Sequence, residues 1–134
     1  MNSIVLDSAA VLAMIQGETG GQRVEALLDS IEVGADVQVC ISWVNWCEVL
    51  TRTQRDNRGM TAEELSAALA GVELVPFGRA AAELAAGYAK VSRALSLGDR
   101  ACLALAKLNN ATAWTANRIW IQFQLDVPVE LIRP

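Results

Sequence analysis

The sequence predicts an α/β fold, with a single domain over residues 1–134 that forms a doubly wound parallel sheet of about five strands flanked by helices. Short apolar runs typical of buried strands alternate with segments whose apolar residues recur every three or four positions. Hydrophobic residues make up 53% of the chain and charged residues 19%, which suits a compact core rather than a disordered chain. These observations together indicate one layered domain.

The first half of the chain is expected to form two strands and three helices. In order, these are a strand at 3–7, helices at 8–17 and 21–34, a strand at 36–41, and a long helix from 43 towards 59. Val24, Leu27, Leu28 and Ile31 have the spacing of an amphipathic helix. Ser42 is the expected N-cap of the long helix, because its side chain can accept a hydrogen bond from a first-turn amide.

The second half continues the alternation of strands and helices. It is expected to contain a helix at 61–71, a strand at 72–77, a helix at 78–96, a helix at 99–110, a strand at 111–116, a short helix from Asn117 and a strand at 127–133. Thr61 and Glu64 have the spacing of a capping box. Pro76 limits the strand that contains it, and Asp99 is the expected cap of the helix that it opens.

Composition and charge exclude several classes of function. The chain has no histidine, so it has no histidine acid–base catalysis, no Ser–His or Cys–His nucleophile and no imidazole-bound zinc. Cys40, Cys47 and Cys102 lie in apolar segments without CxxC spacing and are expected to be buried. The net charge of −4 argues against a large positive field for nucleic acid, but permits a nuclease whose metal supplies positive charge. No apolar run could cross a bilayer and no signal peptide is present, which predicts a cytoplasmic protein.

Three acids and one amide lie at strand–helix junctions or inside a helix. Asp7, Asp99 and Asn117 each precede an apolar helical run, and each alone is explained as a helix cap. Glu48 lies in mid-helix, where pairing with Arg52 on the helix surface is the simplest explanation. Neither explanation covers all four residues. Carboxylates among apolar residues are costly unless a cation offsets their charge, and a hard divalent metal ion prefers oxygen ligands.

Several arginines lie close to these positions in the sequence. Arg52, Arg55 and Arg58 follow Glu48 at three-residue steps, which indicates either a solvated helix face or a row that contacts phosphates. Arg100 and Arg118 directly follow Asp99 and Asn117 and have the same two interpretations.

The segments IVLDSAAVLA, WVNWCEVL, LGDRACLALA and WTANRIW, in this order, make the chain resemble the PIN-domain family, and within it the small VapC-type toxins of toxin–antitoxin modules. The resemblance covers nearly the whole chain. It implies a metal-dependent endoribonuclease in which Asp7, Glu48, Asp99 and Asn117 occupy the ligand positions for Mg²⁺ or Mn²⁺, and Thr115 contacts a metal-bound water. It also implies an RNA substrate, an antitoxin partner and a homodimer. The four tryptophans agree with a dimer, because they are hard to bury fully in so small a domain.

Asn117 departs from the family pattern, which has an acid at this position. An amide oxygen can ligate Mg²⁺ but brings no negative charge, so weaker metal binding and low or absent activity are expected. The amide is either natural or an inactivating change, and Asp126 is the only nearby acid that could replace it. A second hypothesis is therefore a binding module without catalysis, whose acidic crevice receives an antitoxin segment.

Other acidic α/β domains fit the sequence less well. A haloacid-dehalogenase-type phosphatase needs a second acid two residues after the first, where this chain has Ala9. The paired acids of a response-regulator receiver are absent. So are the glycine-rich motifs of P-loop and dinucleotide-binding domains.

Overall fold

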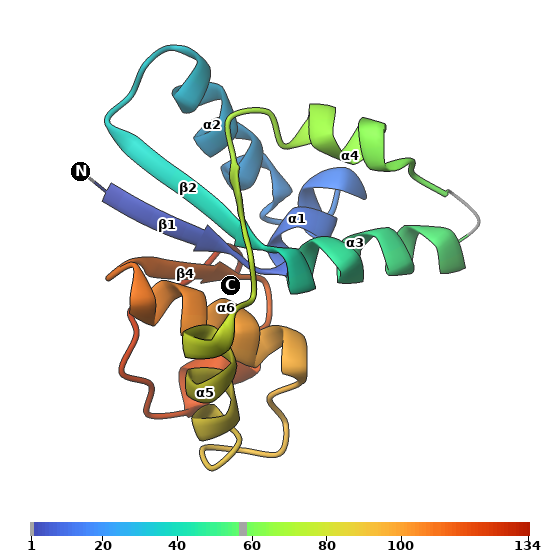
Figure 1. Ribbon diagram of the computed structural model, residues 1–134. Coiled ribbons are helices and arrows are strands. Elements are labelled where there is room, and N and C mark those ends of the chain that lie inside the picture. Colours follow the sequence, from blue (N-terminus) through green and yellow to red (C-terminus); the bar gives the residue numbers. More distant parts are fainter. Residues whose placement is uncertain (1, 57–58) are drawn as a thin grey trace.

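The computed structural model describes residues 2–56 and 59–134, and its centre is one five-stranded sheet (Figure 1). The strands lie in the order β3-β2-β1-β4-β5, and every neighbouring pair is parallel. Their bounds are β1 Asn2–Leu6, β2 Val37–Ser42, β3 Glu73–Val75, β4 Thr112–Thr115 and β5 Val129–Leu131. The predicted α/β fold with a doubly wound parallel sheet is confirmed.

Helices cover both faces of the sheet. They are α1 Ser8–Ile15, α2 Gly21–Glu32, α3 Trp43–Arg55, α4 Ala62–Ala68, α5 Arg79–Tyr88, α6 Leu97–Leu108 and the 3₁₀ helix η1 Arg118–Gln122. Figure 1 shows α1, α2 and α4 on one side of the sheet and α5 and α6 on the other. Ile4 and Leu6 of β1 pack into the core on the first side, whereas Val5 between them packs into the core on the second. This alternation is the two-residue period of a strand buried on both faces.

Most helix boundaries follow the predicted caps. The Ser42 hydroxyl oxygen accepts a hydrogen bond from the Val44 amide at 3.1 Å, and Thr61 with Glu64 forms the predicted capping box. The helix α3 ends at Arg55, and Arg58, predicted to extend the arginine row, lies outside the described residues.

Two predicted boundaries were wrong. The helix predicted over 78–96 ends at Tyr88, because the chain must fold back for Leu95 to enter the same core as Tyr88. The N-cap of α6 is Ser96 rather than Asp99. Asp99 lies on the third helical position, where its carboxylate completes a capping box with Ser96.

The sheet order places its topological switch point between β1 and β4. These strands are parallel neighbours, and the Asp7 amide continues their pairing by donating to the Trp114 carbonyl at 3.1 Å. The residues that follow β1 and β4, among them Asp7 and Asn117, therefore share one edge of the sheet. Crevices beyond the carboxyl ends of strands at such a point commonly bind ligands. No helix in the described ranges, 2–56 and 59–134, is long and apolar enough to cross a membrane.

Candidate metal centre

Asp7 lies at the end of β1 and caps α1. Its Oδ1 accepts a hydrogen bond from the Ala10 amide at 2.7 Å, and its Oδ2 accepts one from the Thr115 hydroxyl. Only 2% of Asp7 is exposed. The predicted cap is therefore real, but a surface cap would not be buried in this way.

Burial and the charges of two other acids shift the ionisation of Asp7. Burial is the main cause that raises the pKa of Asp7 to about 7, and the charges of Asp99 and Glu48 raise it further. The hydrogen bonds from Thr115 and Ala10 oppose this shift. The folded chain thus holds a carboxyl group that is half ionised near neutral pH and that a nearby cation would ionise fully.

Glu48 is half-buried on α3 and faces α1 and α6. Its Oε1 accepts hydrogen bonds from the Ser8 hydroxyl at 2.9 Å and from the Asn45 side-chain amide at 3.0 Å. The carboxylate also lies so close to Gly98 that a Cβ there would overlap it. Arg52 instead pairs with Asp56, its Nε lying 3.7 Å from Oδ2. The alternative of a surface pair between Glu48 and Arg52 is therefore not what the structure contains.

Asp99 lies on the first turn of α6, beside the contact between α6 and α3. Its Oδ2 accepts a hydrogen bond from the Ser96 amide at 2.9 Å, and the residue is half-buried. The Asn45 side-chain amide donates to the carbonyl of Gly98, the residue before Asp99, at 3.0 Å. This contact holds the α6 turn that bears Asp99 against the α3 turn that bears Glu48.

Asn117 is connected to Asp7 through Thr115. The Thr115 hydroxyl, fully buried, donates to Asp7 and accepts a hydrogen bond from the Asn117 backbone amide at 2.9 Å. The Asn117 side-chain oxygen accepts from the Ile119 amide at 3.2 Å and caps η1. Because the single Thr115 proton goes to Asp7, a contact between Thr115 and a metal-bound water would have to use the hydroxyl oxygen as acceptor.

The donor chemistry of these residues suits a hard divalent cation. Three carboxylates and an amide offer only oxygen ligands, and the charges of Asp99 and Glu48 add to burial in raising the pKa of Asp7. In residues 2–56 and 59–134, however, no three Asp, Glu or Cys side chains lie close enough together to hold an ion. Each carboxylate accepts a hydrogen bond from a donor of the chain, and ligation of one ion by all three would require at least one of them to move.

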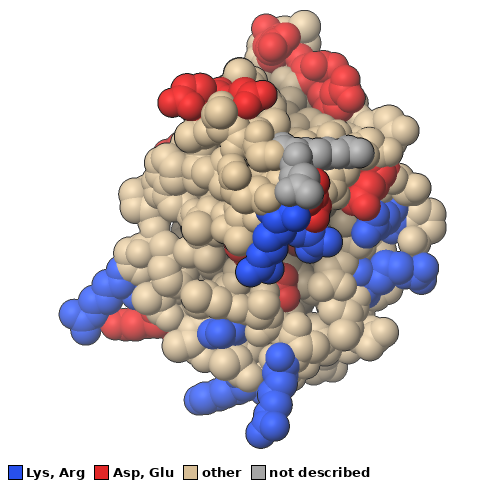
Figure 2. All heavy atoms as spheres, turned by 90° about the vertical axis from the view of Figure 1, so that its right-hand side faces the viewer, with Lys and Arg blue, Asp and Glu red and all other residues tan. Residues whose placement is uncertain are grey.

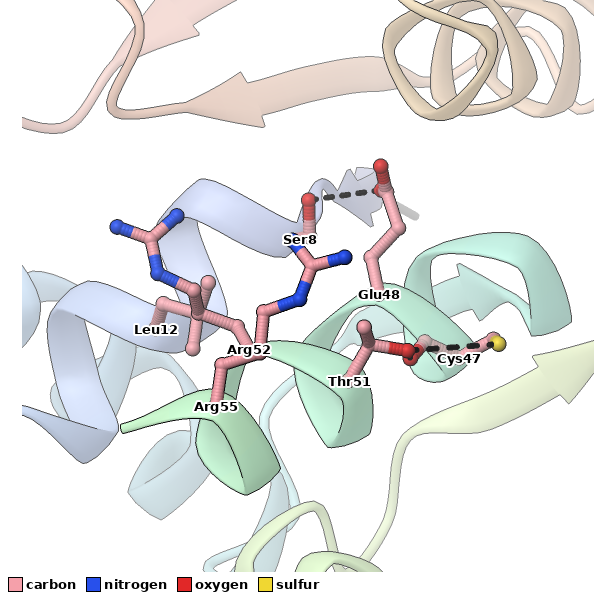
Figure 3. A pocket seen from close by; sticks show the side chains of 7 residues that line it. All are labelled: Ser8, Leu12, Cys47, Glu48, Thr51, Arg52 and Arg55. Carbon is pink, nitrogen blue, oxygen red and sulfur yellow. Dashed lines mark hydrogen bonds between the residues drawn. The ribbon is translucent and has the colours of Figure 1, made fainter. Parts of the chain in front are cut away.

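A hollow of about 250 Å³ opens beside Glu48 between α1 and α3 (Figure 3). Ser8 and Leu12 line it from α1, and α3 contributes Cys47, Glu48, Thr51, Arg52 and Arg55. Figure 2 looks onto the side of the molecule towards which α3 runs. It shows Lys and Arg groups across the middle and lower part of this face, with a few acidic groups between them. The acidic residues could bind a cation, and the arginines beside them could bind the negative oxygens of a phosphate diester.

The structure corrects the sequence predictions for three other residues, Cys47, Arg100 and Asp126. Cys47 is exposed rather than buried, because the core-facing side of α3 is taken by Trp46 and Val49. The Arg100 guanidinium donates to the Ala85 and Leu95 carbonyls and so joins α6 to the preceding segment.

Asp126 does not replace the missing acid. Its carboxylate binds the Tyr88 hydroxyl and lies 3.2 Å from Lys107 Nζ, beside the end of α6 remote from Asp99. Arg118 is exposed, which agrees with its interpretation as a solvated surface residue.

Sequence reasoning missed the part played by Ser8 and Gly98 and left Asn45 without a role. Asn45 lies one helical turn before Glu48, which was a signal that the two side chains meet. Nothing local in the sequence signals that Gly98 approaches Glu48, because that contact joins two separate helices.

Comparison with known proteins agrees with this fold. No curated protein matches the chain. Among solved structures, a chain of VapBC-1 from nontypeable Haemophilus influenzae matches with a TM-score of 0.68 at 14% identity, covering 97% of this chain and 98% of that one. A chain of VapBC2 from Rickettsia felis, bound to a DNA fragment from their promoter, matches with a TM-score of 0.67 at 17% identity, covering 96% and 97%. A chain of FitAcB from Neisseria gonorrhoeae matches with a TM-score of 0.64 at 20% identity, covering 96% and 97%. At these identities the likeness concerns the fold. The sequence also matches the family model described as PIN domain over residues 4–124, so the chain belongs to the PIN-domain family.

Proposed function

We propose that this chain is a metal-dependent endoribonuclease of the VapC type, the toxin of a toxin–antitoxin module. The observation that carries the proposal is a chain of contacts beyond the carboxyl end of β1: Ser8, next to Asp7, bonds Glu48, and Asn45 bonds both Glu48 and the carbonyl of the residue before Asp99. Structural likeness to chains of VapBC and FitAB complexes supports the toxin assignment. The absence of histidine agrees with it, because carboxylates and a metal ion suffice for this chemistry.

The residues that would hold Mg²⁺ or Mn²⁺ are Asp7, Glu48 and Asp99, with Asn117 as a neutral ligand. A bound ion supplies an activated water and neutralises charge that develops on the phosphate. Thr115 holds Asp7 in place through its hydroxyl proton and so leaves the orientation of that carboxylate fixed. Asn117 lowers the negative charge of the site by one unit, and we expect weaker binding of metal than an acid there would give.

The arginine-lined hollow is the proposed path of the RNA backbone. Arg52 and Arg55 are exposed on the wall of the hollow that ends at Glu48. Their guanidinium groups can donate to phosphate oxygens on the nucleotides next to the cleaved bond. We therefore assign Arg52 and Arg55 to phosphate contact rather than to a solvated face.

The alternative is a binding module that receives an antitoxin segment in the acidic crevice and cleaves nothing. One observation favours it, namely that the three carboxylates already satisfy internal donors and do not form a ready-made metal cluster among the described residues. An antitoxin arginine entering the crevice could then supply the positive charge that the site lacks.

RNA cleavage by the purified chain separates the two functions. With Mg²⁺ or Mn²⁺ we expect slow cleavage of single-stranded RNA that EDTA stops and Asp7→Ala abolishes. Asn117→Asp should raise both metal affinity and cleavage, by about tenfold or more if the added charge strengthens ligation. Arg79→Ala, remote on α5, serves as a control that should cleave like the unaltered chain.

The contrary outcome is equally clear. If neither the unaltered chain nor Asn117→Asp cleaves RNA under any divalent ion, while the chain still binds an antitoxin peptide in EDTA, the binding module is correct and the ribonuclease proposal is wrong.

A further inference from the structure

We infer that Asn45 is a positioning residue that fixes the Glu48 carboxylate and sets its place relative to Asp99. This inference rests on the proposed function, because it assigns a task within the same site. The Asn45 Nδ2 group donates to Glu48 Oε1 and to the Gly98 carbonyl, each at 3.0 Å. One amide group therefore ties the second acid of the site to the helix turn that carries the third.

Ser8 and Gly98 complete a cradle around Glu48. The Ser8 hydroxyl donates to the same Oε1 at 2.9 Å, and Ser8 directly follows Asp7. Gly98 leaves open the volume that the carboxylate fills, since a Cβ at this position would overlap it. Glu48 is thus held from α1, α3 and α6, the three helices that bear or follow the acids of the site.

The hydrogen bonds of the cradle hold only one of the two oxygens of the Glu48 carboxylate. Both hydrogen bonds end on Oε1, and no donor among the described residues bonds Oε2. An oxygen held in place but left without a protein donor is a preorganised ligand for a cation, because its position need not change much on binding.

The amide of Asn45 is not explained by packing alone. Asn45 is fully buried, and its Oδ1 has no hydrogen-bond partner among the described residues. An unpaired buried acceptor of this kind costs about 1–3 kcal/mol, which an apolar side chain of similar size would avoid. The two bonds made by Nδ2 are what offset this cost, and both serve the placement of acids.

Two substitutions and a matched control test the cradle. Asn45→Leu keeps the approximate size and removes the donor without adding a charge beside Glu48. Gly98→Ala places a Cβ where the Glu48 carboxylate lies. Gly87→Ala is the control, because Gly87 is also helical but a Cβ there meets nothing within 4 Å.

Mn²⁺ affinity, measured by electron paramagnetic resonance, is the first readout. We expect Asn45→Leu and Gly98→Ala to bind Mn²⁺ about 10–100-fold more weakly than the unaltered chain, and Gly87→Ala to bind it equally. Ser8→Ala should weaken binding in the same direction, whereas Ser8→Thr, which keeps the hydroxyl, should restore it. A purely structural role would lower the unfolding midpoint of the variants but leave the affinity of the folded fraction unchanged.

Crystal structures of the metal-free variants are the second readout and do not depend on the proposed function. We expect the Glu48 carboxylate to leave the cradle in both Asn45→Leu and Gly98→Ala. If it stays in place in both, or if Mn²⁺ affinity changes less than twofold, the inference is overturned. If the unaltered chain and Asn117→Asp bind no Mn²⁺ at all, the proposed function fails, and the metal-free structures still decide the role of Asn45.

Discussion

At the scale of single residues, Asp7 links the stability of the chain to pH. Burial raises the pKa of Asp7 to about 7 in the folded chain, from 3.8 for an unperturbed aspartate. Between about pH 4 and pH 7 the folded chain therefore binds more protons at this site than the unfolded chain does. The contribution of Asp7 to the free energy of unfolding therefore falls as the pH rises through that range, and it stays low above pH 7 when no cation is bound.

Asp7→Asn removes this loss while keeping an oxygen that can cap α1. Without metal, we expect the variant to be more stable than the unaltered chain by about 2–4 kcal/mol at pH 8 and by little at pH 4. Urea unfolding at both pH values measures the difference, and Asp29→Asn on the exposed face of α2 is the control. Added Mn²⁺ should narrow the gap at pH 8, because a bound cation favours the ionised carboxylate. An advantage of equal size at both pH values would contradict the role given to burial.

At the scale of elements, the contact between α1 and α2 depends on a glycine. A Cβ at Gly21 would overlap the carbonyl oxygen of Ala13, which is backbone and cannot move aside as a flexible side chain can. We expect Gly21→Ala to lower the free energy of unfolding by about 1–3 kcal/mol. Gly87→Ala on α5, which has open space, should be neutral or raise it by up to about 1 kcal/mol. Urea unfolding of the two variants side by side checks this, and equal effects would show that α1 and α2 can separate at little cost.

The elements also show where sequence reasoning succeeds. The strands and the caps at Ser42 and Thr61 were predictable, because each depends on residues within a few positions. The end of α5 at Tyr88 was not, since an alanine-rich segment favours helix and only the packing of Leu95 stops it. The Ser96 cap was missed, although Ser96 and Asp99 have the spacing of a capping box.

The residues of the candidate site also divide into those that the sequence could identify and those that it could not. Asp7, Glu48, Asp99 and Asn117 could be named from four short segments, because each acid or amide lies within a recognisable local pattern. The role of Gly98 could not be named, since the contact it makes spans fifty residues of sequence and exists only when α3 meets α6.

At the scale of the whole molecule, the surface keeps apolar groups that a small soluble domain would ordinarily cover. Among the residues that the structure describes, six large apolar ones are well exposed, including Trp43 at 42%, Leu97 at 52%, Leu108 at 50% and Ile121 at 60%. Trp120, in contrast, is only 1% exposed, so the tryptophans divide between core and surface as expected. Where exposed apolar side chains lie together in one patch, they favour association with a second chain.

We expect the purified chain to form a homodimer that buries part of this apolar surface. Sedimentation equilibrium at micromolar concentration should give twice the chain mass of 14.4 kDa. Replacing one exposed apolar residue at a time by Glu should shift the chain towards monomer when that residue lies in the interface, because an unpaired charge is costly to bury there. Val33→Glu, at the end of α2, and Leu108→Glu, at the end of α6, sample opposite faces of the sheet. A monomer at every concentration up to about 100 μM, well above the dissociation constant of a stable dimer of standard interface size, would contradict the prediction. The exposed apolar groups would then be available to a different partner. Adding an antitoxin peptide to the same sedimentation experiment would show whether the peptide binds the chain.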